Sequence, residues 1–314
     1  MIHFRFHVVS IIAVFLALAI GTVMGSAFVG KAVINNLQKR IDIVSKKADE
    51  RNTANENLKS QIDDFDKYVK ASAPFAVART LTGVRVNLVA ERGIDGGIID
   101  AQAGFLRQAG AIVPGVVWLE STWKLDSPEA TTALRSATGL ANRSRSTLRA
   151  AAGQLLGRRL STALPIGAED ALAKLSDAKF VTVSGVAGSP TPTAADFLGD
   201  AARVLEVGGP GSDVPADVIP GIARGIVVEA GAVAVGEVFA PSDQTPERST
   251  WIDAIANDDV LRNHISTIDD LDRVEGQVGA TLALAELGGA AFGNYGLDRD
   301  RAVPERVPTI PVAR

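Results

Sequence analysis

The side chains of this sequence that could do chemistry are carboxylates placed at the ends of apolar runs. Glu91 ends the run VRVNLVAE, Asp95 follows it, and Glu120 ends the run GVVWLE. If these runs are strands of a parallel sheet, the carboxylates lie near its carboxyl edge, where such sheets bind ligands. Position alone does not make a catalytic site, so these residues are candidates for an unrecognised ligand site only.

A glycine-rich loop is the second candidate. Gly208, Gly209 and Gly211 lie between a predicted strand and a predicted helix, the context in which backbone N–H groups bind phosphate. The segment matches neither G-x-G-x-x-G nor the Walker A pattern, because no Lys-Ser or Lys-Thr pair follows. We therefore expect a tight turn that needs positive φ angles.

Three aspartates in the segment ISTIDDLDR could bind a hard cation. Asp269, Asp270 and Asp272 supply the oxygen ligands that such ions prefer, but the spacing of an EF-hand loop is absent. Acidic side chains are also favourable just before and within the first turn of a helix. We expect these three to cap the following helix and to be solvated.

Histidine and cysteine chemistry is scarce. The sequence has no Cys, which excludes disulfides and thiolate ligands, and it has three His. His264 is the one outside the first seven residues, and no G-x-S-x-G motif accompanies it. His3 and His7 share a helical face next to an apolar run, where interfacial residues are expected. We expect no catalytic residues, no metal site and no cofactor, and therefore no enzyme.

The element that precedes all of these residues is an uncharged apolar run over residues 8–30. No charged side chain occurs until Lys31, and a helix of this length spans about 34 Å, enough to cross a bilayer core of ~30 Å. A cleaved signal peptide is the alternative, but its apolar region would be only about 7–15 residues long. The run predicts a transmembrane helix in contact with the lipid bilayer.

The orientation of this run in the membrane does not follow simply from the Lys and Arg residues that flank it. Arg5 lies on one side, and the other side carries Lys31, Lys39, Arg40, Lys46 and Lys47, so a Lys/Arg count would place the large domain inside the cell. An anchor so near the start of the chain, followed by a large domain, is instead typical of secretion. We predict a single-pass plasma-membrane protein with residues 1–7 in the cytoplasm and the bulk of the chain outside it.

Residues 31–70 carry a seven-residue apolar repeat, which predicts a coiled-coil stalk. Its heptad positions, from residue 34 to residue 69, would span about 54 Å. The a positions are Ile34, Ile41, Ala48, Asn55, Ile62 and Val69, and the d positions are Leu37, Val44, Arg51, Leu58 and Phe65. β-Branched residues at a with Leu at d favour a parallel two-stranded coil, and a single Asn at a fixes register. The alternative is an amphipathic helix that packs on the globular domain. The charges do not separate a homodimer from a heterodimer.

Inside the apolar run, Ala17, Gly21 and Gly25 form a small-xxx-small series that could let a second helix approach. The extended heptad frame places Leu16, Ile20, Val23 and Ala27 on the seam, so the glycine face points away from it. One interpretation is a second, different transmembrane partner. The other is that Gly and Ala are simply common in membrane helices.

The remaining residues are enough for a globular domain with a real core, predicted over residues 79–296. The stalk should break between Lys70 and Pro74. Alternating strands and helices predict an α/β fold with a mostly parallel sheet, and the formal net charge of −4 gives no sign of nucleic-acid binding. The strands are expected at 84–91, 110–120, 180–185 and 230–240, and the helices at 98–108, 128–137, 145–160, 169–175, 250–256 and 274–287. Residues 202–225 are expected to form a strand, then the glycine-rich loop, then a helix. Residues 241–246 are expected to form a loop, and 297–314 a disordered tail.

The layout resembles a known family. The start MIHFRFHVVS, the anchor VFLALAIGTVMGS, a coiled coil, a Cys-free α/β domain, STIDDLD and then NYG together resemble the actinobacterial MctB/SteB family over nearly the full chain. One family name implies copper transport or copper tolerance in the cell envelope. The other implies a regulator of cell separation that pairs with a SteA-like membrane partner and controls a peptidoglycan hydrolase.

The residues favour the second implication. Copper(I) prefers thiolate, thioether or imidazole ligands, and this chain offers two Met and three His without any Cys. An anchor, a stalk for pairing and a globular domain without a recognised catalytic motif are the parts of a scaffold. We interpret the chain as a regulator of cell division and separation. A copper transport or tolerance protein is the first alternative, and an enzyme with an unrecognised site in the α/β domain is the second.

Overall fold

The computed structural model describes residues 3–140, 143–162, 170–197, 202–209, 211–229, 231–238, 251–289 and 292–295. It divides into two compact units, Met1–Lys67 and Tyr68–Arg314. The loop predicted at 241–246 and the tail predicted at 297–314 lie outside the described residues.

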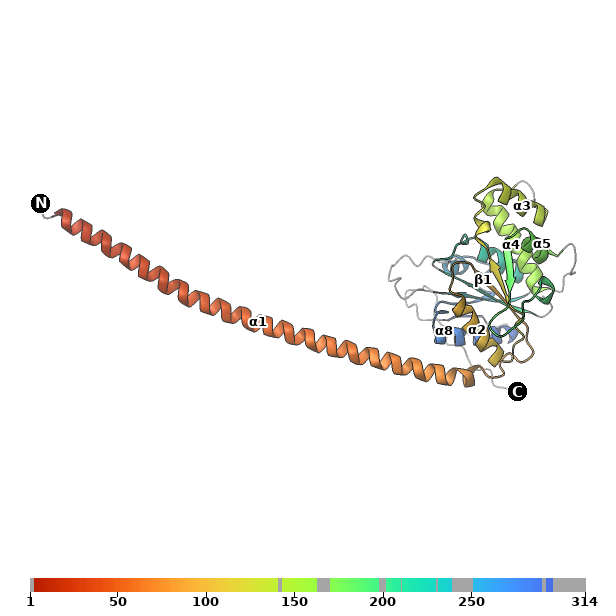
Figure 1. Ribbon diagram of the computed structural model, residues 1–314, viewed down its shortest axis with the longest axis horizontal. Helices are drawn as coiled ribbons and strands as arrows, with labels where there is room; N and C mark the ends of the chain where they lie inside the picture. The colour runs from red at the N-terminus through yellow and green to blue at the C-terminus, as the bar shows by residue number, and fades with distance from the viewer. Residues whose placement is uncertain are drawn as a thin grey trace. The chain divides into compact units, whose positions relative to one another are not determined.

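The first unit consists of helix α1, which spans His3–Val77 and so continues into the second unit (Figure 1). Its segment Phe4–Gly25 has a mean hydropathy of 2.5 and no burial, so it is long and apolar enough to cross a membrane. This segment overlaps the predicted span.

The predicted break between Lys70 and Pro74 is wrong, because α1 passes through Pro74. A proline inside a helix removes one backbone hydrogen bond and costs about 3 kcal/mol. Here the last turns have compensating contacts: Ala73 is buried and Val77 is fully buried within the core of the second unit. Tertiary packing therefore overrides the local preference.

The described part of the second unit contains one seven-stranded sheet in the order β3-β2-β1-β4-β5-β6-β7. All neighbours are parallel except β2 and β3. The strands are β1 (Val86–Glu91), β2 (Val116–Leu119), β3 (Val181–Ser184), β4 (Arg203–Gly208), β5 (Ala232–Glu237), β6 (Ile265–Ile268) and β7 (Asn294–Tyr295). The predicted α/β class with a mostly parallel sheet is confirmed.

This order is that of a doubly wound sheet, in which the chain runs outward in both directions from a central pair of strands. The central pair here is β1 and β4. Strand β6 was not predicted, since its four residues were grouped with the acidic segment that follows them. The carboxyl ends of β1 and β4 form the topological switch point, the usual place for ligands in such sheets.

Helices cover both faces of the sheet (Figure 1), as expected for parallel strands that are buried on two sides. One face carries α3 (Pro128–Thr138), α4 (Arg145–Ser161), α5 (Ala171–Asp177), α6 (Val218–Val228) and α7 (Trp251–Ala256). The other face carries α2 (Gly96–Gln108), α8 (Val274–Glu286) and the last turn of α1. Short 3-10 turns occur at Ser121–Lys124, Ala194–Asp196 and Leu287–Gly289.

Two helix starts follow from their capping residues. The Ser127 hydroxyl accepts a hydrogen bond from the Ala130 N–H at 3.1 Å with Pro128 in the first turn, so Ser127 is the N-cap of α3. The Asp95 carboxylate accepts one from the Gly97 N–H at 2.9 Å and caps α2.

Helices α4 and α6 pack with their backbones in contact through four glycines. A Cβ at Gly157 would collide with the carbonyl oxygen of Ile222, and one at Gly225 with that of Gln154. Gly153 and Gly221 lie one turn away and are similarly enclosed. Each helix therefore presents a G-x-x-x-G stripe to the other, a spacing that lets two helices approach closely.

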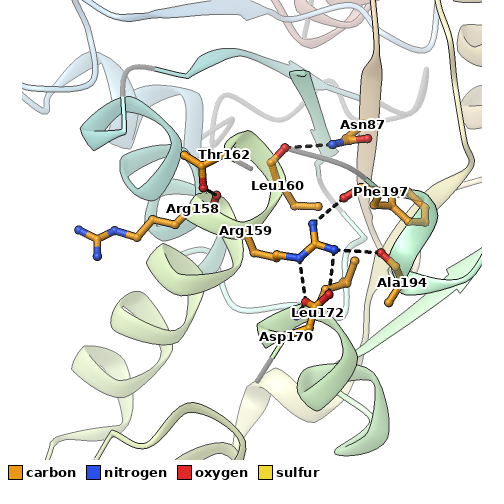
Figure 2. Close-up of polar contacts among 9 residues, drawn as sticks. All are labelled: Asn87, Arg158, Arg159, Leu160, Thr162, Asp170, Leu172, Ala194 and Phe197. Atoms are coloured by element: carbon orange, nitrogen blue, oxygen red, sulfur yellow. Dashed lines mark hydrogen bonds and ion pairs between the residues drawn. The ribbon is translucent and has the colours of Figure 1, made fainter. Parts of the chain in front are cut away.

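A buried ion pair ties the end of α4 to the start of α5. The Arg159 guanidinium donates to both carboxylate oxygens of Asp170 at 2.8 Å, and the two side chains are only 2% and 1% exposed. Figure 2 shows the same guanidinium donating to the carbonyl oxygens of Phe197 and Ala194. The Asn87 amide donates to the Leu160 carbonyl at 2.9 Å and links α4 to β1.

Candidate functional site

The predicted glycine loop lies at the switch point and is a tight turn. Gly209 and Gly211 have φ angles of 152° and 91°, which confirms the need for glycine. Helix α6 begins only at Val218, so the loop does not lead directly into a helix N-terminus of the phosphate-binding kind. The Asp213 N–H donates to the Arg92 carbonyl at 2.8 Å, and a Cβ at Gly93 would collide with Gly211 O. The loop is therefore packed against the end of β1.

Beneath this loop lies the carboxyl group of Glu91, which is 1% exposed. The Gly209 N–H donates to its Oε2 at 3.4 Å, and the Ser212 hydroxyl also bonds this carboxyl group. Its Oε1 is buried without a hydrogen-bond partner among the described residues. Burial raises the pKa of Glu91 to about 8, and the bonds from Ser212 and Gly209 only partly oppose that shift.

Glu206 is a second buried carboxyl group on the neighbouring strand. In the register of β1 and β4 it lies beside Val89, so it shares a sheet face with Glu91, two residues further along β1. Glu206 is fully buried, and neither carboxyl oxygen has a hydrogen-bond partner in the described part of the chain. Burial first, and then the Glu91 carboxyl group, raise the pKa of Glu206 well above its usual value.

Sequence reasoning identified Glu91 and missed Glu206. The available signal was a charged residue in the middle of the apolar strand RVLEVG, which is uncommon for a strand buried on both faces. Glu237, at the end of β5, is a further buried carboxylate on this face, in register with Gly208.

The other two predicted carboxylates are engaged in the surface structure. Asp95 caps α2, as described above. Glu120 accepts a hydrogen bond from Arg92 Nε at 2.9 Å, and the Arg92 guanidinium lies over the Trp118 ring, 4.6 Å from its centroid. The structure thus does not bring Asp95 or Glu120 into the buried pair.

The acidic segment after β6 behaves differently from the prediction. Asp269 is fully buried, so its predicted solvation is wrong; as β6 ends at Ile268, Asp269 lies at the edge of the sheet. The N-cap of α8 is Arg273, and it makes no side-chain cap bond. Burial, followed by the neighbouring Asp269, raises the pKa of Asp270 to about 7. The neighbouring Asp269 carboxyl group therefore disfavours a negative charge on Asp270.

The histidines and the acidic residues that the structure describes do not gather into a metal-binding cluster. Among them, no group of three or more His, Asp and Glu side chains is placed to hold a metal ion. The exposed His264 has its Nδ1 2.7 Å from the Val260 carbonyl oxygen and its ring 6.1 Å from that of Phe292. His7 is exposed, and the side chain of His3 lies outside the description.

The predicted stalk positions form an exposed stripe on α1 that is apolar except at Arg51 and Asn55. Ile34 is 61% exposed, Leu58 55% and Phe65 57%, and the other predicted a and d positions before Val69 are exposed as well. Val69 is half-buried and belongs to the second unit. Gly21 and Gly25 have open space where a Cβ would be. Whether these surfaces pair with another helix remains a prediction.

Comparisons with known proteins match nearly the whole chain. A family model described as "Copper transport outer membrane protein, MctB" matches residues 1–304. Proteins named "Copper transporter MctB" from Mycobacterium bovis and from two strains of Mycobacterium tuberculosis are each 29% identical over 312 residues. These alignments cover 94% of this chain and 96% of each relative.

Proposed function

This chain belongs to the MctB family, and on that premise we propose that it is a membrane-anchored cell-envelope protein of copper transport or copper tolerance. The observation that carries the proposal is the extent of the match, which includes the apolar helix, the stalk and the α/β unit together. The copper function of the named relatives is thereby extended to this chain. This reverses the order of preference that the residues alone suggested.

The ligand chemistry favours an indirect part in copper handling. Copper(I) is bound by thiolate, thioether and imidazole groups, and the chain has no Cys, two Met and three His. A single membrane helix also encloses no pore by itself. We therefore propose that the chain acts within an assembly whose other members contact the metal.

The test is genetic and chemical. In the bacterium that encodes this chain, deletion of its gene is expected to raise cell-associated copper and to lower the copper concentration that stops growth. The wild-type gene and a variant with His3, His7 and His264 all replaced by Ala should restore both. Unchanged copper content and tolerance in the deletion strain would overturn the copper function, and a triple variant that fails to complement would favour a direct ligand role.

We propose that the N-terminus lies in the cytoplasm and the α/β unit outside it. The apolar helix near the start of the chain supports this orientation, because a large following domain is commonly translocated regardless of flanking charge. Protease added to intact spheroplasts should degrade the α/β unit. Protection of that unit until the cells are lysed would contradict the orientation.

The exposed stripe on α1 supports a second candidate function, the regulation of cell separation. Its apolar a and d residues are the surface that a coiled coil buries, in a homodimer or with a SteA-like membrane partner. Such an assembly would transmit partner binding to a peptidoglycan hydrolase. Replacing Ile41 and Leu58 by Asp should then abolish pairing and yield cells that fail to separate; normal separation despite lost pairing would exclude this role.

We propose that the α/β unit is not an enzyme. Two of the candidate carboxylates, Asp95 and Glu120, are used in a helix cap and a surface ion pair. A thermal-shift screen of the full chain with nucleotides and cell-wall fragments checks this, and a ligand that raises the melting temperature would reopen the enzyme alternative.

A further inference from the structure

We propose that Glu91 and Glu206 form a proton-holding pair that keeps the glycine loop closed over the switch point of the sheet, and that proton loss from Glu91 opens this loop. The glycine loop comprises the described residues Gly209, Gly211 and Ser212. The pair is thus a pH-responsive latch at the edge where doubly wound sheets bind their ligands. It is independent of the copper proposal and of pairing through α1.

The geometry joins the pair to the loop by direct contacts. The Glu91 carboxyl group accepts the Gly209 N–H at 3.4 Å and is bonded by the Ser212 hydroxyl, so one carboxyl group contacts both ends of the loop. Asp213 directly follows the loop, and Arg92 directly follows Glu91. The Asp213 N–H donates a hydrogen bond to the Arg92 carbonyl oxygen at 2.8 Å. Whatever alters the charge of Glu91 therefore acts on the segment that covers it.

A charge on either glutamate has little to stabilise it. Glu91 Oε1 and both Glu206 oxygens are buried without hydrogen-bond partners in the part of the chain that the structure describes. A buried carboxylate in that state is strongly disfavoured relative to the neutral acid, and two such groups side by side disfavour each other's charge. Protons are therefore the expected occupants of the pair.

The surrounding charged groups do not supply a counter-ion. Arg92, directly after Glu91, forms an ion pair with Glu120, and Lys124 and Arg149 form ion pairs with Asp213 and Asp217, which follow the loop. Four acidic groups also lie toward this edge, where negative charge favours the protonated form, and the cation Arg273 follows them and forms an ion pair with Glu275. The four acidic groups are Glu237 at the end of β5 and Asp269, Asp270 and Asp272 after β6.

A bound metal ion is a weaker explanation than a proton. No third His, Asp or Glu joins the pair to make a metal-capable group among the described residues. A hard divalent cation takes six or more oxygen ligands or keeps several waters, which two buried carboxyl groups under a packed loop do not accommodate.

The direction of the pH effect follows from the raised pKa of Glu91. A carboxyl group that is neutral when the loop is closed and exposed to water when it is open binds its proton more tightly in the closed state. Loop closure is then fully supported below pH ~4.3, the ordinary value for Glu. The support is lost progressively as the pH rises to about 8, the pKa of Glu91 in the closed state. Over that interval the opening equilibrium rises by up to tenfold per pH unit.

The experiment is hydrogen exchange on the full chain in detergent micelles at pH 5, 6, 7, 8 and 9. Protection of the amides of Gly209 and of residues 211–214, corrected for the intrinsic exchange rate, should fall by up to tenfold per pH unit up to about pH 8. Glu91→Gln should remove this slope, because the amide keeps the shape but cannot ionise. Glu120→Gln, at the surface ion pair with Arg92, is the matched control and should retain the wild-type slope.

Flat protection in the wild type, or an equal slope in Glu91→Gln, would overturn the latch. A second measurement needs no variant: the side-chain carboxyl resonances of 13C-labelled glutamate. The proposal expects at least one resonance that titrates above pH 7, and titration of every glutamate near its ordinary value would overturn it.

Discussion

Small residues recur at every fourth position in two regions of this molecule. Helix α1 carries Ala17, Gly21 and Gly25, and helices α4 and α6 each carry a glycine pair with the same spacing. In α4 and α6 each stripe is filled by the backbone of the other helix. In α1 a Cβ at Gly21 or Gly25 would meet open space.

The spacing of small residues alone therefore does not identify a surface on which helices pack. The glycines of α4 and α6 have their partner within the same chain, so their effect is on the stability of the α/β unit. For the apolar surfaces of α1 before Lys67, the predicted partners are lipid and a helix of another chain. Variants in the two regions should therefore differ in what they change: unfolding in one, association in the other.

The largest effect is expected where the α/β unit has a buried ion pair. Arg159→Met should lower the free energy of unfolding by about 3–5 kcal/mol, because it leaves the Asp170 carboxylate buried without its counter-ion. Denaturant unfolding followed by tryptophan fluorescence measures this, since all three Trp lie in the second unit. Arg158→Met, at a half-exposed pair with Glu229, is the neighbouring control and should cost no more than about 1 kcal/mol. Equal losses of unfolding free energy in both variants would contradict the larger contribution expected of the buried ion pair.

The next effect concerns the glycine contact between α4 and α6. Gly157→Ala should lower the free energy of unfolding by about 1–3 kcal/mol, because its Cβ collides with backbone and the helices must separate. Gly104→Ala in α2 has open space and should be neutral or stabilise by up to about 1 kcal/mol. If both substitutions stabilise the protein, the close approach of the two helices is wrong.

Substitution in the α1 stripe should leave the α/β unit unchanged. Leu58→Asp places a charge at a predicted d position and should lower the mass of the detergent-solubilised assembly, with a change in unfolding free energy below about 0.5 kcal/mol. Ser60→Asp, at position f, should leave the mass at its wild-type value. An unchanged mass of the assembly for Leu58→Asp would contradict the predicted coiled coil.

The smallest effect is expected within the apolar segment of α1. Gly21→Ile should leave unfolding of the α/β unit unchanged and reduce chemical cross-linking between membrane helices several-fold, provided that a partner helix uses this stripe. Ala19→Ile, on the opposite side of the helix, serves as the control. Identical cross-linking in both variants would mean that the small residues of α1 are not a contact surface.

Much of the fold could be predicted because it depends on local patterns. The apolar run, the first strand and the cap at Ser127 are each readable from a short stretch of sequence. Strand β6 was missed, since its four residues are followed at once by an acidic segment that suggested a helix cap. The break at Pro74 was predicted from local preference, whereas burial of Ala73 and Val77 decides that the helix continues.

The period of apolar residues along the chain is enough to indicate the α/β class, the membrane-type helix and the heptad pattern. The position of Glu91 beside Glu206 and under Gly209 depends on the fold, since β1 and β4 are adjacent in the sheet although Glu91 and Gly209 are 118 positions apart in the chain. The same holds for the contact of Gly157 with Ile222 and of Arg159 with Asp170. Such neighbours depend on strand order and helix packing, which no local pattern encodes.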